Sequence, residues 1–135
     1  MKDILASALP DLKWSVNYYF DNDNTGTVYA HGGNGVASYE SPLLYPSYQV
    51  FIRSTDWDKA ELYADRTLHI LNKRFNEMHE VYLYKDNKPY IKRTVELLYL
   101  ENQGGVLSLG VVEDDVREYS INFDATLRII NEEEL

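Results

Sequence analysis

Two aspartates that follow the first apolar segment have the residue type and spacing for chemistry. Asp21 and Asp23 stand two positions apart in the run Asp-Asn-Asp-Asn-Thr. Paired carboxylates are among the residue types that carry out acid–base chemistry in proteins. The run also matches the start of a calcium-binding loop. However, Thr25 stands at the fifth position of that loop and Gly32 at the twelfth, where a bidentate glutamate is required. The sequence therefore predicts no calcium site here.

The same run is similar to the first motif of haloacid-dehalogenase-type phosphatases, in which the first aspartate is the nucleophile and the second a general acid. Residues 50–54 and 111–115 resemble further strand ends of that family, because they close apolar runs with a hydroxyl residue and with paired acids. That fold needs parallel strands alternating with helices, which the segments after these runs do not provide. A polar loop is the favoured interpretation, and a phosphatase using Asp21 and Asp23 is the enzymatic alternative.

No other group of residues has the spacing of a catalytic, metal or cofactor site. His31, His69 and His79 do not have the spacing of metal ligands. The chain has no cysteine and no Gly-x-Ser-x-Gly motif. The glycines at 32–35 are not followed by the lysine and hydroxyl residue of a phosphate-binding loop. The sequence therefore predicts a protein that is not an enzyme and carries no cofactor.

Length and charge restrict the remaining classes. A chain of 135 residues with 44% hydrophobic content predicts a single domain, spanning 1–135, with a real core. The net charge of −9 argues against a protein that grips nucleic acid through its phosphates. No apolar run reaches the roughly 20 residues needed to span a bilayer, and the start lacks the pattern of a signal peptide. The absence of cysteine fits the cytosol.

The segment that organises the chain is a strand that leads directly into the longest helix, over residues 45–75. Alternating residues at 47–53 predict a strand with one buried face. Ser54, Thr55 and Asp56 are candidate N-caps of the helix. One apolar helix face follows at steps of three and four residues: Trp57, Ala60, Ala64, Leu68, Leu71 and Phe75.

The remaining segments predict an α+β domain. We expect a helix over 2–9, a strand over 14–20, a long flexible loop over 21–44 with at most a short strand at 27–29, and a hairpin loop at 102–105 between two strands. The clearest alternation predicts a last strand from 119 to 129. Because only two helices are expected, most connections are hairpins. The predicted fold is a mostly antiparallel sheet with two helices packed on one face.

Gln49, Phe51 and Arg53 lie on the outer face of the predicted strand at 47–53. Phe51 there is either part of a second buried face or part of a protein interface. The loop tyrosines Tyr29 and Tyr39 are further candidate anchors, because a neighbouring subunit can supply the burial that the loop lacks. Together these five residues form the candidate subunit interface.

Three stretches resemble the tail terminator proteins of long-tailed bacteriophages, also called tail completion, tail-to-head joining or minor capsid proteins. They are the polar segment DNDNTGTVYAHGG, the strand and helix LLYPSYQVFIRSTDWDKAELYADRTLHIL, and the final alternating strand REYSINFDATLRI. Chain length and element order agree over nearly the whole sequence. No single motif is diagnostic, and the combination carries the resemblance.

The resemblance implies a structural virion assembly protein of a siphovirus-like tail. Such a subunit forms a ring, typically a hexamer, that caps the tail tube, ends its polymerisation and joins the tail to the head connector or head-closure protein. It implies a place at the head–tail interface of the virion after assembly in the host cytoplasm, with DNA passing through without specific binding. A non-enzymatic protein-binding adaptor is a further alternative.

Overall fold

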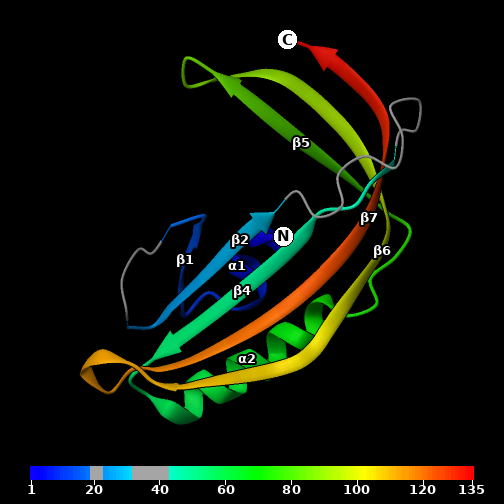
Figure 1. The fold of residues 1–135 in the computed structure, drawn as a ribbon. Helices are drawn as coiled ribbons and strands as arrows, with labels where there is room; N and C mark the ends of the chain where they lie inside the picture. Colours follow the sequence, from blue (N-terminus) through cyan, green and yellow to red (C-terminus); the bar gives the residue numbers. More distant parts are fainter. Residues whose placement is uncertain (19–22, 32–42) are drawn as a thin grey trace.

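The computed structural model describes residues 1–18, 23–31 and 43–135 (Figure 1). Two helices, seven strands and a short 3-10 turn follow one another along this part of the chain. Their bounds are α1 Lys2–Ala8, β1 Lys13–Val16, β2 Thr25–His31, β3 Leu43–Leu44, β4 Ser47–Ser54, α2 Trp57–Leu71, β5 Glu77–Lys85, β6 Lys88–Val111, η1 Glu113–Asp115 and β7 Arg117–Glu134.

All described strands belong to one sheet, with the order β1-β2-β4-β7-β6-β5 and with β3 paired to β7. The sheet is mixed, because β1 runs parallel to β2 while the other pairs are antiparallel. The expected fold class, a mostly antiparallel sheet, is therefore wrong. Of the described residues, 61% lie in strands, so that this part of the chain is mostly β and α+β describes it only roughly. The parallel pair arises because the segment expected to be loop supplies β2.

The predicted hairpin loop at 102–105 is also wrong, because β6 continues through it as one strand of 24 residues. Gly104 and Gly105 have φ angles of +83° and +72°. The pairing with β7 skips them, so that Gln103 faces Asn122 and Val106 faces Ile121. Glycine adopts positive φ at little cost, and here the two glycines form a bulge instead of reversing the chain.

β6 and β7 are long and bent, and they curl the sheet around the helices (Figure 1). Their pairing shifts register at four places, between residues 94 and 95, 97 and 99, 103 and 106, and 108 and 110 of β6. Bulges of this kind bend a strand and increase its twist. The lower halves of the two strands thereby pack on α2, while their upper halves turn away with β5.

The core lies on the concave face of the curled sheet. α2 begins at the N-cap Asp56, whose carboxylate accepts a hydrogen bond from the Lys59 backbone N–H at 3.2 Å. Its small residues Ala60 and Ala64 are fully buried and allow the helix to approach the sheet closely. Trp57 and Phe75, expected on the same apolar face, are exposed. The other buried members of the core are Leu5, Leu12, Val28, Val50, Ile52, Leu71, Leu97, Leu100, Tyr119, Ile121, Phe123 and Ala125.

β2 falls inside the segment expected to be a flexible loop. Its Gly26 lies under the indole ring of Trp14, and a Cβ on that glycine would stand 2.4 Å from the ring. Trp14 is fixed by a 2.9 Å hydrogen bond from its Nε1 to the Leu9 carbonyl. A glycine that signals a loop in the sequence therefore serves close packing between β1 and β2. The rest of the expected loop, residues 32–42, lies outside the described residues.

Candidate functional site

Of the two aspartates that suggested chemistry, Asp23 has a structural contact and Asp21 lies outside the described residues. The Asp23 carboxylate accepts hydrogen bonds from the Thr55 backbone N–H at 2.8 Å and from the Thr55 hydroxyl at 3.0 Å. The Thr55 backbone hydrogen bond lowers the pKa of Asp23 below its usual value. Beside it, the Ser54 hydroxyl donates to Asn24 at 2.6 Å. These contacts join the start of β2 to the junction between β4 and α2.

The histidines do not come together. His69 lies on the exposed face of α2 with its Nδ1 3.4 Å from the Asp65 carboxylate, whereas His79 lies on β5 and His31 ends β2. Within residues 1–18, 23–31 and 43–135, no cluster of His, Asp or Glu has the arrangement of a metal site.

Four of the five predicted interface residues meet on the outer face of the sheet. The rings of Tyr29 and Phe51 form an edge-to-face pair with centroids 5.6 Å apart. The Arg53 guanidinium lies 4.9 Å from the Phe51 centroid. Gln49 donates to the Ser120 hydroxyl at 3.1 Å. Tyr39, the fifth residue, lies outside the described residues, so the predicted interface stays a prediction.

Arg53 is engaged within its own chain. Its side chain pairs with the Glu118 carboxylate across β4 and β7, and the residue is 1% exposed. Its Nη1 also lies 3.5 Å from the Thr27 hydroxyl. Arg53 therefore holds this face together, while Tyr29, Gln49 and Phe51 are half-buried and form its accessible part.

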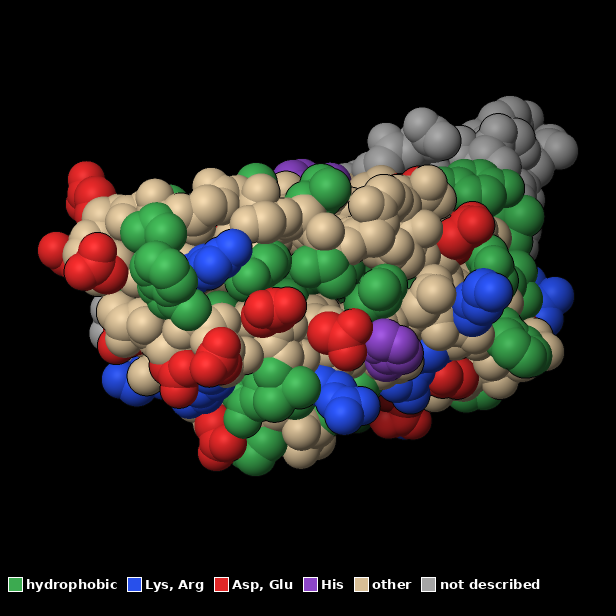
Figure 2. Space-filling model, turned by 90° about the horizontal axis from the view of Figure 1, so that it is seen from below, with side chains coloured by type: hydrophobic (Ala, Val, Ile, Leu, Met, Phe, Trp, Pro, Cys, Tyr) green, Lys and Arg blue, Asp and Glu red, His purple; other side chains and the backbone are tan. Residues whose placement is uncertain are grey.

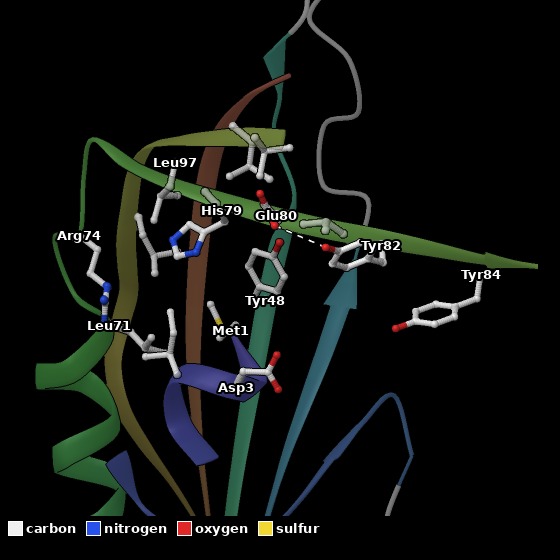
Figure 3. Close-up of a pocket in the computed structure, with 16 residues that line it drawn as sticks. Met1, Asp3, Tyr48, Leu71, Arg74, His79, Glu80, Tyr82, Tyr84 and Leu97 are labelled. Carbon is white, nitrogen blue, oxygen red and sulfur yellow. Dashed lines mark hydrogen bonds between the residues drawn. The ribbon is translucent and has the colours of Figure 1, made fainter. Parts of the chain in front are cut away.

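The concave face carries a cavity of about 430 Å³ between α1, the end of α2 and β5 (Figure 3). Tyr48 extends from β4 into the middle of this space, below His79 and Glu80 on β5 (Figure 3). Burial raises the pKa of the Tyr48 phenol. Apolar side chains form much of the wall: Ile4, Leu71, Val81, Val95, Leu97, Leu100, Ala125 and Leu127.

Charged groups at one side of this cavity pair with each other. Arg74 donates from Nε to Glu77 at 2.8 Å, and His79 Nε2 lies 3.1 Å from the other oxygen of Glu77. The hydrogen bond from Arg74 lowers the pKa of Glu77 below its usual value. These charges are therefore balanced locally, while Asp3 and Glu80 are further acidic residues of the cavity wall. The sequence does not predict this cavity, because its wall comes from segments far apart in the chain.

Above the cavity, three strand segments extend beyond the helices: β5, residues 88–94 of β6 and residues 129–134 of β7 (Figure 1). We call them the arm. Its strands are joined by side chains as well as by the backbone. Lys92 lies 3.2 Å from Glu80, Arg93 lies 2.5 Å from Glu132, and the Tyr90 hydroxyl donates to Glu134 at 2.6 Å.

The arm exposes large hydrophobic side chains among its ion pairs, and the face that includes α2 also mixes hydrophobic and charged side chains. Exposed on the arm are Met78, Val81, Tyr82, Leu83, Tyr84 and Ile130. On the face seen from below in Figure 2, hydrophobic side chains are interspersed with acidic and basic ones. The arm therefore combines a long backbone edge with apolar side chains that its own chain leaves uncovered.

Comparison with known proteins returned no matching family model and no matching curated protein. Among the helices that the structure describes, neither has the length and hydrophobicity required to cross a membrane.

Proposed function

We propose that this protein is a structural assembly protein of a long-tailed phage or prophage, a tail terminator without enzymatic activity of its own. It forms a ring, with six copies as the expected number, on the end of the tail tube. There it ends tube polymerisation and binds the head connector or head-closure protein. The observation that supports this function best is the arm, because it presents binding surface instead of a reaction site.

The arm gains little from burial in the isolated chain. Most of its residues are exposed, and exposed ion pairs of the kind that join its strands contribute only about 0–1 kcal/mol each. Even a three-stranded sheet needs a buried hydrophobic face, or packing against a helix, to be stable in water on its own. Burial against a partner would supply roughly 25 cal/mol for each Å² of apolar surface removed from water. An arm of this kind fits a protein whose final state is an assembly.

The outer face of the sheet provides a second contact surface for the ring. Tyr29, Gln49 and Phe51 lie side by side on β2 and β4 and remain partly accessible. Aromatic residues are enriched at protein interfaces because their rings bury large apolar areas. In the proposed ring these residues contact the neighbouring subunit. The buried Arg53 supports them through its contact with Phe51, and Tyr39 is a further candidate for the interface.

The charge of the chain agrees with DNA passing through the ring. With 22 acidic and 13 basic residues, the protein carries a net charge of −9. Clustered lysine and arginine side chains would bind the phosphates and slow the passage of the genome. The proposed ring lets DNA pass without specific binding, and its place is the head–tail interface of the virion.

Deletion of the gene from a phage that encodes it tests the function. We expect filled heads without tails and free tails of uncontrolled length, counted by negative-stain microscopy. Normal virions from the deletion strain would overturn the proposal. The neighbouring reading frames separate this function from that of a host adaptor, since a head-closure gene on one side and a tube gene on the other are expected.

Two matched variants then test the role of the arm. Ile130 on the arm and Leu62 on α2 are 48% and 49% exposed, so an aspartate at either site leaves the core intact. Complementation with Ile130→Asp is expected to leave tails unjoined, whereas Leu62→Asp restores virions. Equal numbers of virions from the two variants, at equal thermal stability, would show that the arm is not the binding surface.

A further inference from the structure

β5 forms one edge of the sheet, and no other described strand pairs with its outer side. It is nine residues long and contains neither proline nor glycine. Hydrophobic side chains are exposed along most of it, from Met78 to Tyr84. A long edge strand with exposed apolar side chains is a template for pairing with another strand.

The other open edges of the described sheet are less suited to pairing. β1 has only four residues. The lower part of β6, which β5 does not cover, is interrupted by register shifts near Gly105 and Gly110. Bulges of this kind twist an edge away from a prospective partner. β5 is the most regular of these edges, since its pairing with β6 shifts register at one place, between Leu83 and Tyr84.

We propose that two copies of this chain pair through their β5 strands, antiparallel, with the two-fold axis at Val81. In this register each residue of one copy lies opposite the residue equally distant from Val81 in the other copy. All nine residues of β5 then take part, and the sheet continues from one copy into the next. The interface is isologous, as in most symmetric dimers.

The side chains of β5 complement each other in this register, and no like charges meet. Met78 and Tyr84, the most exposed hydrophobic residues of the strand at 56% and 67%, lie opposite each other and cover each other. The ammonium group of Lys85 lies over the Tyr90 ring and has no carboxylate partner among the described residues. In the dimer it faces Glu77 of the second copy, which also contacts Arg74 and His79 of its own chain. The remaining opposite pairs are His79 with Leu83 and Glu80 with Tyr82.

The cavity on the concave face lies along the same edge. Val81, Tyr82 and Tyr84 belong both to β5 and to the cavity wall (Figure 3). A second strand beside β5 therefore extends that wall and removes these side chains from water together. Pairing through β5 would therefore cover both the unpaired edge of the sheet and the adjoining side of the cavity.

The dimer is independent of the proposed function. Neighbouring subunits of a ring on the end of a tube are not related by a two-fold axis at β5. The β5 dimer would therefore form in the free protein and not in the ring. Subunits would have to separate at β5 before the arm binds a tail component.

A single cysteine at the two-fold axis tests the pairing, because the chain has no cysteine of its own. Directly opposite residues of an antiparallel pair have Cα atoms about 4.5–5.5 Å apart, within the range of a disulfide. Val81→Cys is therefore expected to form a covalent dimer under mild oxidation. Leu107→Cys on β6 is the matched control, since the two positions are 43% and 42% exposed. We expect at least about tenfold slower cross-linking of the control.

Charge reversal provides a second measurement on the uncross-linked protein. Sedimentation equilibrium of the unmodified chain is expected to show a monomer–dimer equilibrium. Lys85→Glu is expected to weaken it about tenfold, since it replaces two opposite-charge pairs with two like-charge pairs. A protein that stays monomeric at high concentration, or Val81→Cys that cross-links no faster than Leu107→Cys, would overturn the dimer. Either result leaves the deletion phenotype unaffected, so the dimer and the proposed function fail separately.

Discussion

The lower and upper halves of β6 and β7 belong to the same strands but are stabilised in different ways. In the lower half, Ile121 and Phe123 of β7 are buried between α2 and the neighbouring strand β4. In the upper half, the strands pack on no helix and are joined by backbone pairing and by ion pairs such as Lys92 with Glu80. Burial therefore fixes the fold in one half, while the other half leaves large apolar side chains exposed.

A pair of truncations tests this difference with the largest expected effect. Leu71→Ala removes a fully buried side chain between α2 and the sheet, and the cavity is expected to lower the free energy of unfolding by about 2–5 kcal/mol. Val81→Ala on the exposed edge of the arm is expected to change it by no more than about 0.5 kcal/mol. Urea unfolding of dilute protein measures both. Equal losses would mean that the arm belongs to the core.

A substitution at Gly26 probes the packing at the opposite edge of the sheet. In Gly26→Ala the new Cβ meets the Trp14 ring, which its hydrogen bond to the Leu9 carbonyl holds in place. We expect a loss of about 1–3 kcal/mol, the usual cost of overpacking. The same change in a Trp14→Ala background is the control and is expected to cost less. An equal cost in both backgrounds would place the strain elsewhere.

Acid pH is expected to destabilise the protein by a smaller amount through two carboxylates. Hydrogen bonds from Thr55 to Asp23 and from Arg74 to Glu77 hold their pKa values below the usual 3.8 and 4.5. Because the folded pKa values are lowered, the stabilisation is complete above these usual values. It is lost as the pH falls through the folded pKa values.

The variant Asp23→Asn separates the contribution of one carboxylate. We expect it to be less stable than the unmodified chain at pH 7 and to approach it as the pH falls below 3.8, measured by thermal unfolding over a pH series. A constant difference between the two proteins would show that the Asp23 contact does not depend on its charge.

The sequence predicted the elements whose pattern comes from one-sided burial. The last strand was predicted from alternation, and Tyr119, Ile121 and Phe123 are buried as expected. The short first helix and α2 with its N-cap candidate Asp56 are also confirmed. In these segments the local pattern and the tertiary packing agree, so that the elements can be predicted from sequence alone.

The incorrect predictions concern glycines, because a glycine can mark a turn or loop, form a bulge, or allow close packing. Gly104 and Gly105 predicted a turn. However, β7 is long enough for its pairing with β6 to continue past them, and the two glycines form a bulge. Gly26 predicted a loop, although it allows Trp14 to pack on β2. Both outcomes depend on a distant partner, and no local pattern contains that information.

The candidate site was predicted only in part, for the same reason. Alternation along β4 predicted that Gln49, Phe51 and Arg53 share one face. It did not predict that Arg53 is buried, because that burial depends on the ion pair with Glu118 from β7. The cavity and the arm arise from the curl of β6 and β7. That curl follows from four register shifts, which periodicity in the sequence does not reveal.

Amide hydrogen exchange tests the division between core and arm most directly. In dilute, monomeric protein, the amides of β5 that bond to β6 are expected to exchange at least about 100-fold faster than those of β4 at Val50 and Ile52. Local opening of the arm needs far less free energy than global unfolding. If the arm binds tail components as proposed, the same β5 amides become protected in that complex. Equal protection of β5 and β4 in the free monomer would contradict the division.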